Sequence, residues 1–350
     1  MPFPAPYPTL LVNDVRMMTA VAGALTEALG RFPILGGRMP PISMVFVDES
    51  TSPPQFLHGG MEFGNTHYSA SLLKMAAMYA AFELRNSVNN RASQDDATPG
   101  NLFGILNAEF DPVIDGAVPL ISQQRDVTRR MRLPSYQMLF TTIPLTTGGV
   151  AVEFTGAFRN NMNAMMVDSN NNAAAAVVQT LGYSWINGAL EEGGYFRSAF
   201  PPGGIWLAGT FTGSQPYVRI TSDNDGPVAQ AMTTFDMANL CAHIVQKTLV
   251  SDEASTQMSK MWFDAAHGPD ASFIDHERRP ELSTRSYSVT HTKVGLGPLK
   301  SGATVASDAT LLVHVPTDRK FLTVWQNSPG NPEGFNAMSF IVDRTIELFG

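Results

Sequence analysis

The feature of this sequence that most limits its possible folds is the stretch from Thr66 to Leu84, THYSASLLKMAAMYAAFEL, which contains neither glycine nor proline. It is rich in Ala, Leu and Met, which favour helices, and after Ser71 it is apolar on nearly every side. A helix without a polar face must be surrounded by protein, so we expect a buried central helix here. The rest of the chain has to supply the layers that cover it.

The composition indicates a globular protein and argues against several partners. The 350 residues are 44% hydrophobic and 15% charged, enough to bury a large core. The net charge is −8 and no Lys/Arg cluster is present, so we expect no nucleic-acid partner. The single cysteine, Cys241, excludes an intrachain disulfide, and the histidines show no HxxxH or HxH spacing, so we expect no metal or other cofactor.

The start of the chain has no basic segment followed by an apolar run, and no stretch approaches the roughly 18 apolar residues of a membrane span. We therefore expect a soluble protein without a membrane span. The missing signal peptide favours the cytoplasm, although an exported protein that has lost its signal would have the same sequence. The oligomeric state is left open.

Strand and helix patterns at the two ends of the chain predict one shared sheet. The expected order is a helix over 10–29, strands over 41–48 and 55–58, strands over 287–297, 304–315 and 320–326, and a helix over 336–349. Between them, helical spacing dominates except in a Gly/Pro/Thr-rich region over 193–227. We predict an α/β (α+β) fold with an antiparallel sheet of about five strands, flanked by helices and interrupted by a mainly helical insertion. Residues 1–65 and 284–350 would form the sheet lobe and 66–283 the helical lobe, with the active site between them.

Ser71 and Lys74 are the first candidate catalytic pair. A three-residue step on a helix puts the hydroxyl and the amine on one face, where they can touch. A lysine in an apolar helix loses solvation, which favours the neutral amine that can accept the serine proton. The alternative is a lysine whose amine reaches the helix edge.

Ser169 and Asn171 form a second candidate group, in an SxN spacing directly before a predicted helix over 173–181. They could supply a proton-relaying hydroxyl and a substrate-holding amide, or simply cap that helix. The SDN string at Ser222-Asp223-Asn224 competes with them, but Asp225-Gly226-Pro227 follows it, which predicts a loop.

Two lysines compete for the third position, a fixed positive charge for the substrate on the first strand of the C-terminal hairpin. Lys293 begins a KxGxG pattern on the strand, through Gly295 and Leu296, although Val294 stands where a hydroxyl would help to bind a carboxylate. Lys300, with Ser301, begins a KSG string in the predicted turn. The strand periodicity favours Lys293, and both remain candidates.

In this order, SxxK, SxN and K[ST]G resemble the motifs of the penicillin-recognising serine acyltransferases, the class A β-lactamases and related DD-peptidases. The resemblance covers most of the chain in the order of its elements. It implies Ser71 as nucleophile, Lys74 as base, Ser169 as proton relay, Asn171 as substrate holder and Lys293 or Lys300 as the cationic anchor. The backbone N–H groups of Ser71 and of a residue near Leu296 would form the oxyanion hole.

The sequence departs from the class A β-lactamase pattern at one point. In these enzymes a carboxylate activates the water that removes the acyl group from the serine. Pro280-Glu281-Leu282-Ser283 resembles that string only faintly and lies too close to Lys293, while Glu191 and Glu192 lack the surrounding pattern. We therefore expect a serine hydrolase or acyltransferase that acts on a small-molecule or peptide-like amide or ester through an acyl-enzyme. The alternatives are a penicillin-binding sensor of the same fold with slow or no turnover, and an unrelated α/β protein in which the motifs are accidental.

Overall fold

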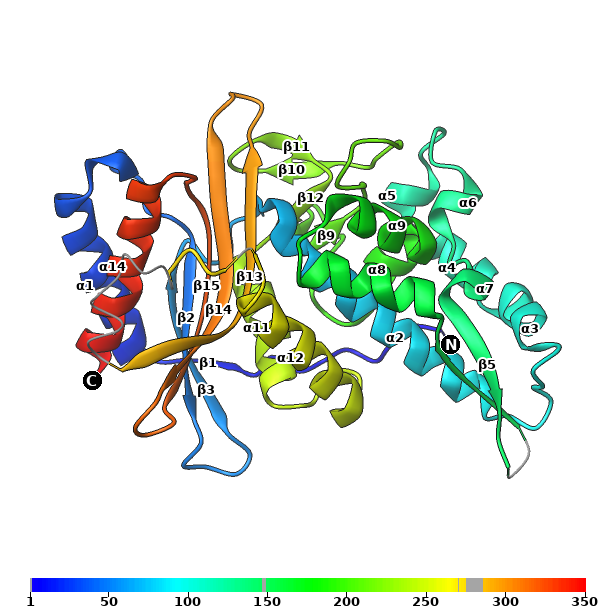
Figure 1. Ribbon diagram of the computed structural model, residues 1–350. Helices are drawn as coiled ribbons and strands as arrows, with labels where there is room; N and C mark the ends of the chain where they lie inside the picture. Colours follow the sequence, from blue (N-terminus) through cyan, green and yellow to red (C-terminus); the bar gives the residue numbers. More distant parts are fainter. Residues whose placement is uncertain (1, 147–148, 270, 275–285) are drawn as a thin grey trace.

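A six-stranded sheet lies between two layers of helices in the computed structural model, which describes residues 2–146, 149–269, 271–274 and 286–350 (Figure 1). The strand order is β1-β3-β2-β15-β14-β13, and every neighbouring pair is antiparallel except β1 with β3. The strands are β1 (Leu11–Asn13), β2 (Ile42–Asp48), β3 (Gln55–Met61), β13 (Tyr287–Pro298), β14 (Thr304–His314) and β15 (Lys320–Pro329). The predicted fold class is confirmed, with one strand more than the expected five.

The additional strand β1 comes from a stretch that was expected to be helical. The helix predicted from residue 10 begins instead as α1 (Val15–Arg31), because the Asp14 side chain caps it by accepting a hydrogen bond from the Met17 N–H at 2.9 Å. The backbone N–H of Asp14 also donates to the His58 carbonyl on β3 at 2.8 Å. Pairing with β3 therefore holds residues 11–13 in an extended conformation, although their apolar spacing continues that of the helix.

Helices cover both faces of the sheet (Figure 1). On one face α1 packs against α14 (Pro332–Phe349), and a core around Trp325 lies beneath them. On the other face α11 (Thr234–Val245) contacts β15 and α12 (Asp252–Ala266) contacts β13. These two helices belong by residue number to the predicted helical lobe yet pack on the sheet; the division into lobes stays a prediction.

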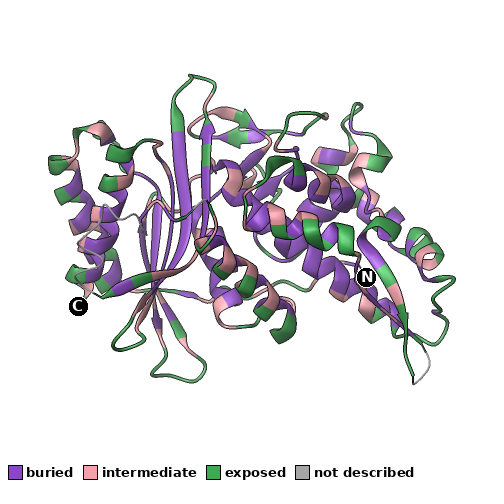
Figure 2. Ribbon diagram, in the orientation of Figure 1, coloured by how far each residue is buried: buried purple, intermediate pink, exposed green. Residues whose placement is uncertain are grey.

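The helical part of the molecule is built around α2 (Lys74–Ala92), which is buried along most of its length (Figure 2). The predicted central helix thus exists but starts at Lys74, after a short strand β4 (His67–Tyr68) and a 3₁₀ turn, η2 (Ala70–Leu73). Around it lie α3 (Leu102–Glu109), α4 (Asp111–Ala117), α5 (Pro119–Ser122), α6 (Arg129–Arg132), α7 (Tyr136–Leu139), α8 (Gly156–Met166), α9 (Asn171–Leu181), α10 (Tyr183–Glu192) and the hairpin β5 (Phe140–Pro144) and β6 (Val150–Phe154).

Short strands connect the two parts. They are β7 (Phe196–Arg197), β8 (Gly203–Gly204), β9 (Trp206–Leu207), β10 (Ile220–Ser222), β11 (Gly226–Val228) and β12 (Gln230–Met232). A three-stranded sheet, β4-β12-β9, places the segment before η2 beside this region. Most of this part of the chain had been expected to consist of loops.

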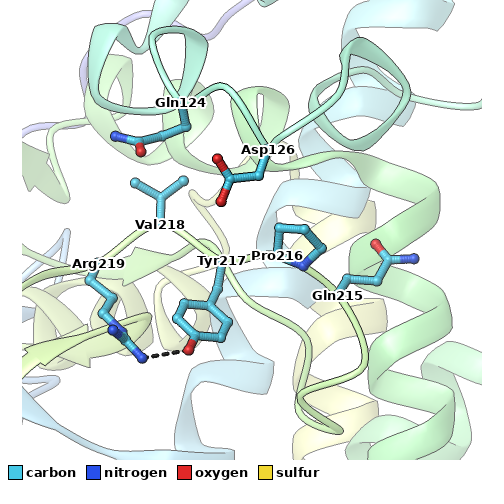
Figure 3. Close-up of a pocket in the computed structure, with 7 residues that line it drawn as sticks. All are labelled: Gln124, Asp126, Gln215, Pro216, Tyr217, Val218 and Arg219. Atoms are coloured by element: carbon cyan, nitrogen blue, oxygen red, sulfur yellow. Dashed lines mark hydrogen bonds between the residues drawn. The ribbon is translucent and has the colours of Figure 1, made fainter.

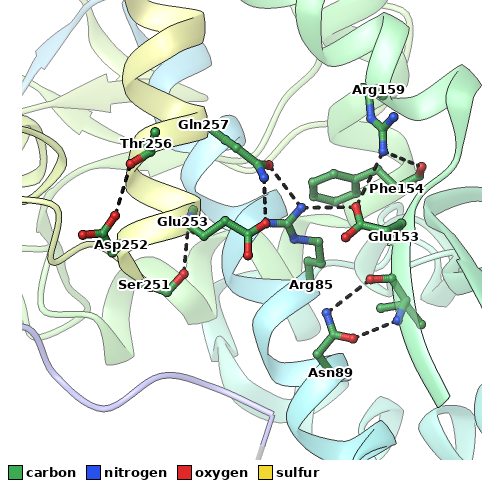
Figure 4. Close-up of polar contacts among 12 residues, drawn as sticks. Arg85, Asn89, Glu153, Phe154, Arg159, Ser251, Asp252, Glu253, Thr256 and Gln257 are labelled. Atoms are coloured by element: carbon green, nitrogen blue, oxygen red, sulfur yellow. Dashed lines mark hydrogen bonds and ion pairs between the residues drawn. The ribbon is translucent and has the colours of Figure 1, made fainter. Parts of the chain in front are cut away.

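A polar cluster centred on Arg85 fastens α2 to its neighbours (Figure 4). Its guanidinium donates to Gln257 on α12 at 3.1 Å and pairs with Glu153 on β6 at 3.4 Å, while it lies over the rings of Phe82 and Phe154. These contacts link α2 to α12 and β6, and Glu153 supplies a counter-charge for the buried cation.

Candidate active site

The turn that carries Ser71 is a strained 3₁₀ turn rather than the first turn of the α-helix. The Leu72 N–H donates to the Ser69 carbonyl at 3.2 Å, and Ala70 has a left-handed φ of 45°. Such strain in a residue other than glycine persists only where the surroundings fix it, and it is common at functional sites. Ser71 is half-buried, and its hydroxyl forms no hydrogen bond with any residue that the structure describes.

Two strands of the large sheet hold this turn in place. The Ser69 hydroxyl donates to the Gln326 side chain at 2.6 Å, and the Ser69 carbonyl accepts a hydrogen bond from Ser307 Oγ at 2.9 Å. A Cβ atom at Gly295 would lie 2.4 Å from the same carbonyl oxygen. The backbones therefore approach so closely that only glycine fits, which explains the first glycine of the KxGxG pattern.

Lys74 is fully buried at the start of α2, and its amine points toward the segment between α8 and α9. Its Nζ donates to the Ser169 carbonyl at 2.5 Å, to Asn171 Oδ1 at 2.8 Å and to Ser169 Oγ at 3.2 Å. None of the hydrogen bonds between described residues joins Lys74 to Ser71. The two side chains are thus not joined by a hydrogen bond here, although residues three apart lie on one face of a 3₁₀ turn as well as of an α-helix.

Lys293 reaches the same place from β13, the outermost strand of the sheet. It is 1% exposed, and its Nζ donates to Ser169 Oγ at 2.8 Å. Ser169 Oγ thus accepts hydrogen bonds from both amines. A hydroxyl has two lone pairs and one proton, so with both lone pairs engaged its proton is directed away from the two lysines.

The segment that presents Ser169 is itself fixed by a helix cap. Ser169 has a left-handed φ of 52°, and the neighbouring Asn170 caps α9 by accepting a hydrogen bond from the Ala173 N–H at 3.0 Å. The capping role considered for this motif therefore belongs to Asn170. It leaves Ser169 and Asn171 for the contacts with Lys74.

Lys300 and Ser301 lie in the turn between β13 and β14 and make contacts there. Lys300 Nζ donates to the carbonyls of Asp225 and Pro227 at 2.8 and 2.7 Å, and the Lys300 N–H donates to Asp225 Oδ1 at 2.7 Å. Ser301 is exposed and accepts a hydrogen bond from the Ala303 N–H at 3.4 Å. Lys293 thus bonds to Ser169, whereas Lys300 bonds to the β10–β11 hairpin.

The SDN string forms part of the β10–β11 hairpin, as the loop prediction implied. Ser222 Oγ donates to the Gly226 carbonyl at 2.8 Å inside this hairpin. The Asn224 side chain, in contrast, supports the chain just before Ser71: its Oδ1 accepts from the Tyr68 N–H at 2.9 Å, and its Nδ2 donates to Asn327 at 3.0 Å. Sequence reasoning missed this supporting role, as it missed Gln326.

The remaining candidates lie around this group. Leu296 is 49% exposed on β13, and Val294 is buried. Glu191 and Glu192 lie at the end of α10, where the Gly193 carbonyl accepts a hydrogen bond from the N-terminal segment. Glu281 lies outside the described residues. His291, two residues before Lys293, has its pKa lowered to about 4 by burial and bonds to Ser259 and Thr290, so it stays neutral and structural.

Two further properties concern cofactors and membranes. Within the described ranges, no three His, Cys, Asp or Glu side chains are grouped so that they could hold a metal ion. No helix in the same part of the chain is long and apolar enough to cross a membrane.

The comparisons with known proteins identify the fold. No protein-family model and no curated protein sequence matches the chain. Solved β-lactamase structures are similar to it. One from Sphaerobacter thermophilus is 13% identical, with a TM-score of 0.51 over 95% of this chain and 97% of that chain. One from Burkholderia phymatum is 10% identical, with a TM-score of 0.52 over 93% and 99%.

A class A β-lactamase from Bacteroides cellulosilyticus is likewise 10% identical, with a TM-score of 0.51 over 95% of this chain and 97% of that chain. Identities this low show the fold alone. The chain has a β-lactamase-like fold, as the order of its motifs predicted.

Proposed function

We propose that this protein is a serine hydrolase or acyltransferase that acts on a small-molecule or peptide-like amide or ester through an acyl-enzyme at Ser71. The observation that carries the proposal is the meeting of Lys74, Ser169, Asn171 and Lys293 at a single hydroxyl, Ser169 Oγ, and its immediate surroundings. These side chains come from three separate segments. Their convergence beside a strained serine turn is the arrangement that this chemistry needs.

In the acylation step Lys74 acts as the general base. To act as a base, Lys74 has to enter this step as the neutral amine. The Ser71 hydroxyl proton passes to Lys74 Nζ while Ser71 Oγ attacks the substrate carbonyl carbon. The negative charge that develops on the carbonyl oxygen is stabilised by the N–H groups of Ser71 and Leu296, the latter on an edge strand whose alternate N–H groups point away from the sheet.

Collapse of this intermediate needs a proton on the leaving group. Ser169 donates its proton to the departing nitrogen or oxygen and is reprotonated from Lys74, which returns to the neutral form. Lys293 holds the positive charge that orients an anionic part of the substrate, and Asn171 positions the substrate through its amide. Water or an amine then takes the acyl group from Ser71.

A penicillin-binding sensor with slow or no turnover is the second candidate. The observation that favours it is the engagement of Lys74 with Ser169 and Asn171 instead of Ser71. In such a protein acylation would take place but the adduct would persist. The lifetime of the adduct therefore separates the two functions.

The test is intact-protein mass spectrometry after incubation with a fluorophosphonate and, separately, with a penicillin. We expect one adduct on the wild type, none on Ser71→Ala, and labelling slowed about 100-fold or more in Lys74→Ala, as for loss of a general base. Ser301→Ala is the matched control, since it removes an exposed hydroxyl outside the site. An adduct that persists in Ser71→Ala, or no adduct with either probe, would refute the proposal.

A further inference from the structure

The loop between β9 and β10 brings an aromatic ring onto the proposed catalytic lysine. The ring centroid of Phe211 lies 5.1 Å from Lys74 Nζ. Lys74 is fully buried, whereas Phe211 is half-buried at the protein surface. The ring is therefore an outer cover over the amine, while Ser169 and Asn171 bind it from the segment between α8 and α9.

The base of this loop is firmly closed. The Val218 N–H donates to the Ala208 carbonyl at 2.8 Å, and the indole N–H of the buried Trp206 donates to the Val218 carbonyl at 3.0 Å. Farther out, the Pro216 carbonyl accepts a hydrogen bond from Tyr183 at 3.0 Å. A compact loop with joined ends can move its tip without disturbing the strands on which it stands.

A cavity of about 610 Å³ lies beside the base of the loop (Figure 3). The residues that line the cavity are Gln124, Asp126, Gln215, Pro216, Tyr217, Val218 and Arg219. Tyr217 and Arg219 pair with each other there, the guanidinium 4.3 Å from the ring centroid.

The segment that contains the loop brings no base of its own to the site. From Gly193 to Ser222 the sequence contains neither Asp nor Glu. The group that it places against Lys74 is an apolar ring. Such a ring excludes water from the amine.

We propose that Phe211 is a specificity-determining residue that keeps water from Lys74 and so directs the Ser71 acyl group to an amine that carries an apolar group. This inference rests on the proposed function. The apolar group of the acceptor takes the place of the ring, and the amine nitrogen forms the new bond to the acyl carbon. Its proton passes to Lys74 and then to Ser71 Oγ, which leaves as the hydroxyl, so the serine is regenerated and an amide is formed.

The first arm of the test measures how far Phe211 shields the Lys74 amine from a reagent in solution, and it does not depend on acylation of Ser71. Acetic anhydride labelling of Lys74, quantified by peptide mass spectrometry against the exposed Lys247, is compared in the wild type, Phe211→Ala and Phe211→Leu. We expect labelling to rise roughly tenfold in Phe211→Ala and less in Phe211→Leu, which retains a smaller apolar cover. Phe200→Ala is the control: it removes a ring that is 96% exposed and should leave the labelling of Lys74 unchanged.

The second arm follows the decay of the penicillin adduct in buffer and with added benzylamine. The wild-type adduct should react faster with benzylamine than with water, and Phe211→Ala should hydrolyse it roughly tenfold faster and lose that preference. Unchanged Lys74 labelling in Phe211→Ala, or faster labelling with unchanged hydrolysis, would overturn the inference about Phe211. Failure of every protein to form an adduct would refute the proposed function and acyl transfer with it, while the labelling arm would still report whether Phe211 covers Lys74.

Discussion

The carboxyl group of Glu83 is buried in α2 and should make the stability of the protein depend on pH. Glu83 is 2% exposed and accepts a hydrogen bond from the Tyr7 hydroxyl at 2.8 Å. The other groups that face it are the Asn86 amide and the hydroxyls of Tyr79 and Tyr195, and within the described part of the chain no cation pairs with it. Burial raises the pKa of Glu83 from 4.5 to about 7.

The sign and size of the effect follow from this shift. The folded state binds the Glu83 proton more tightly than the unfolded state does. The stabilisation of the folded state by this proton is therefore fully present below pH 4.5 and is lost as the pH rises through about 7. One pKa unit corresponds to about 1.4 kcal/mol, so the free energy of unfolding should fall by about 3 kcal/mol between pH 4 and pH 8. That is a large part of the stability of a typical domain.

Glu83→Gln removes this titration while its amide oxygen still accepts the Tyr7 hydrogen bond. Urea denaturation at a series of pH values should show the variant roughly equal to wild type near pH 4.5 and about 3 kcal/mol more stable near pH 8. Glu192→Gln, at an exposed position, is the matched control and should follow the wild type. A difference between Glu83→Gln and wild type that does not change with pH would refute the reasoning.

Three further predictions concern the support of the site. Gly295→Ala should displace the turn that carries Ser71 and slow fluorophosphonate labelling about 100-fold, since small misplacements are that costly, whereas Gly64→Ala, with open space around it, should label normally. Asp308→Ala should lower the free energy of unfolding by about 3 kcal/mol or more in denaturant titrations, because it orphans four hydrogen-bond donors. Lys300→Ala should lower the free energy of unfolding by less than about 1 kcal/mol, because the contacts that it removes are exposed to solvent. It should nevertheless speed amide hydrogen exchange in the turns over 298–303 and 224–228, which these contacts join.

Sequence patterns predicted five of the six strands of the sheet and their places along the chain, because these depend on alternation and on burial along the chain. The strands that contain Lys293 and Phe321 are long and apolar, and the turns between them carry glycine or proline. The strand before α1 could not be found in this way. It is only three residues long, and its pairing with β3 is a contact between distant parts of the chain.

In the candidate site, too, local features could be predicted and long-range contacts could not. Periodicity predicted that Lys293 lies on a strand and Lys300 in the turn after it, because strand and turn positions differ in local sequence pattern. The hydrogen bonds by which Asn224 and Gln326 support the segment before Ser71 could not be predicted. Each joins residues more than 150 positions apart in the sequence. Phe211 gave no signal at all, because an aromatic residue in a polar loop has no periodicity to interpret.

The relation of Ser71 to Lys74 shows why a motif spacing is weaker information than the structure around it. An SxxK step puts two side chains on one face of a helical turn but does not say which partners they bind, and here the close approach of Gly295 accompanies a 3₁₀ turn at Ser71. The amine of Lys74 bonds to Ser169 and Asn171, and the proposed proton transfer from Ser71 would require the two side chains to come together when substrate enters. Movement of Phe211 would accompany that step, because the ring lies on the same amine. Nucleophile activation and access of the acceptor would then depend on one lysine, which is why the labelling of Lys74 is informative even without a substrate.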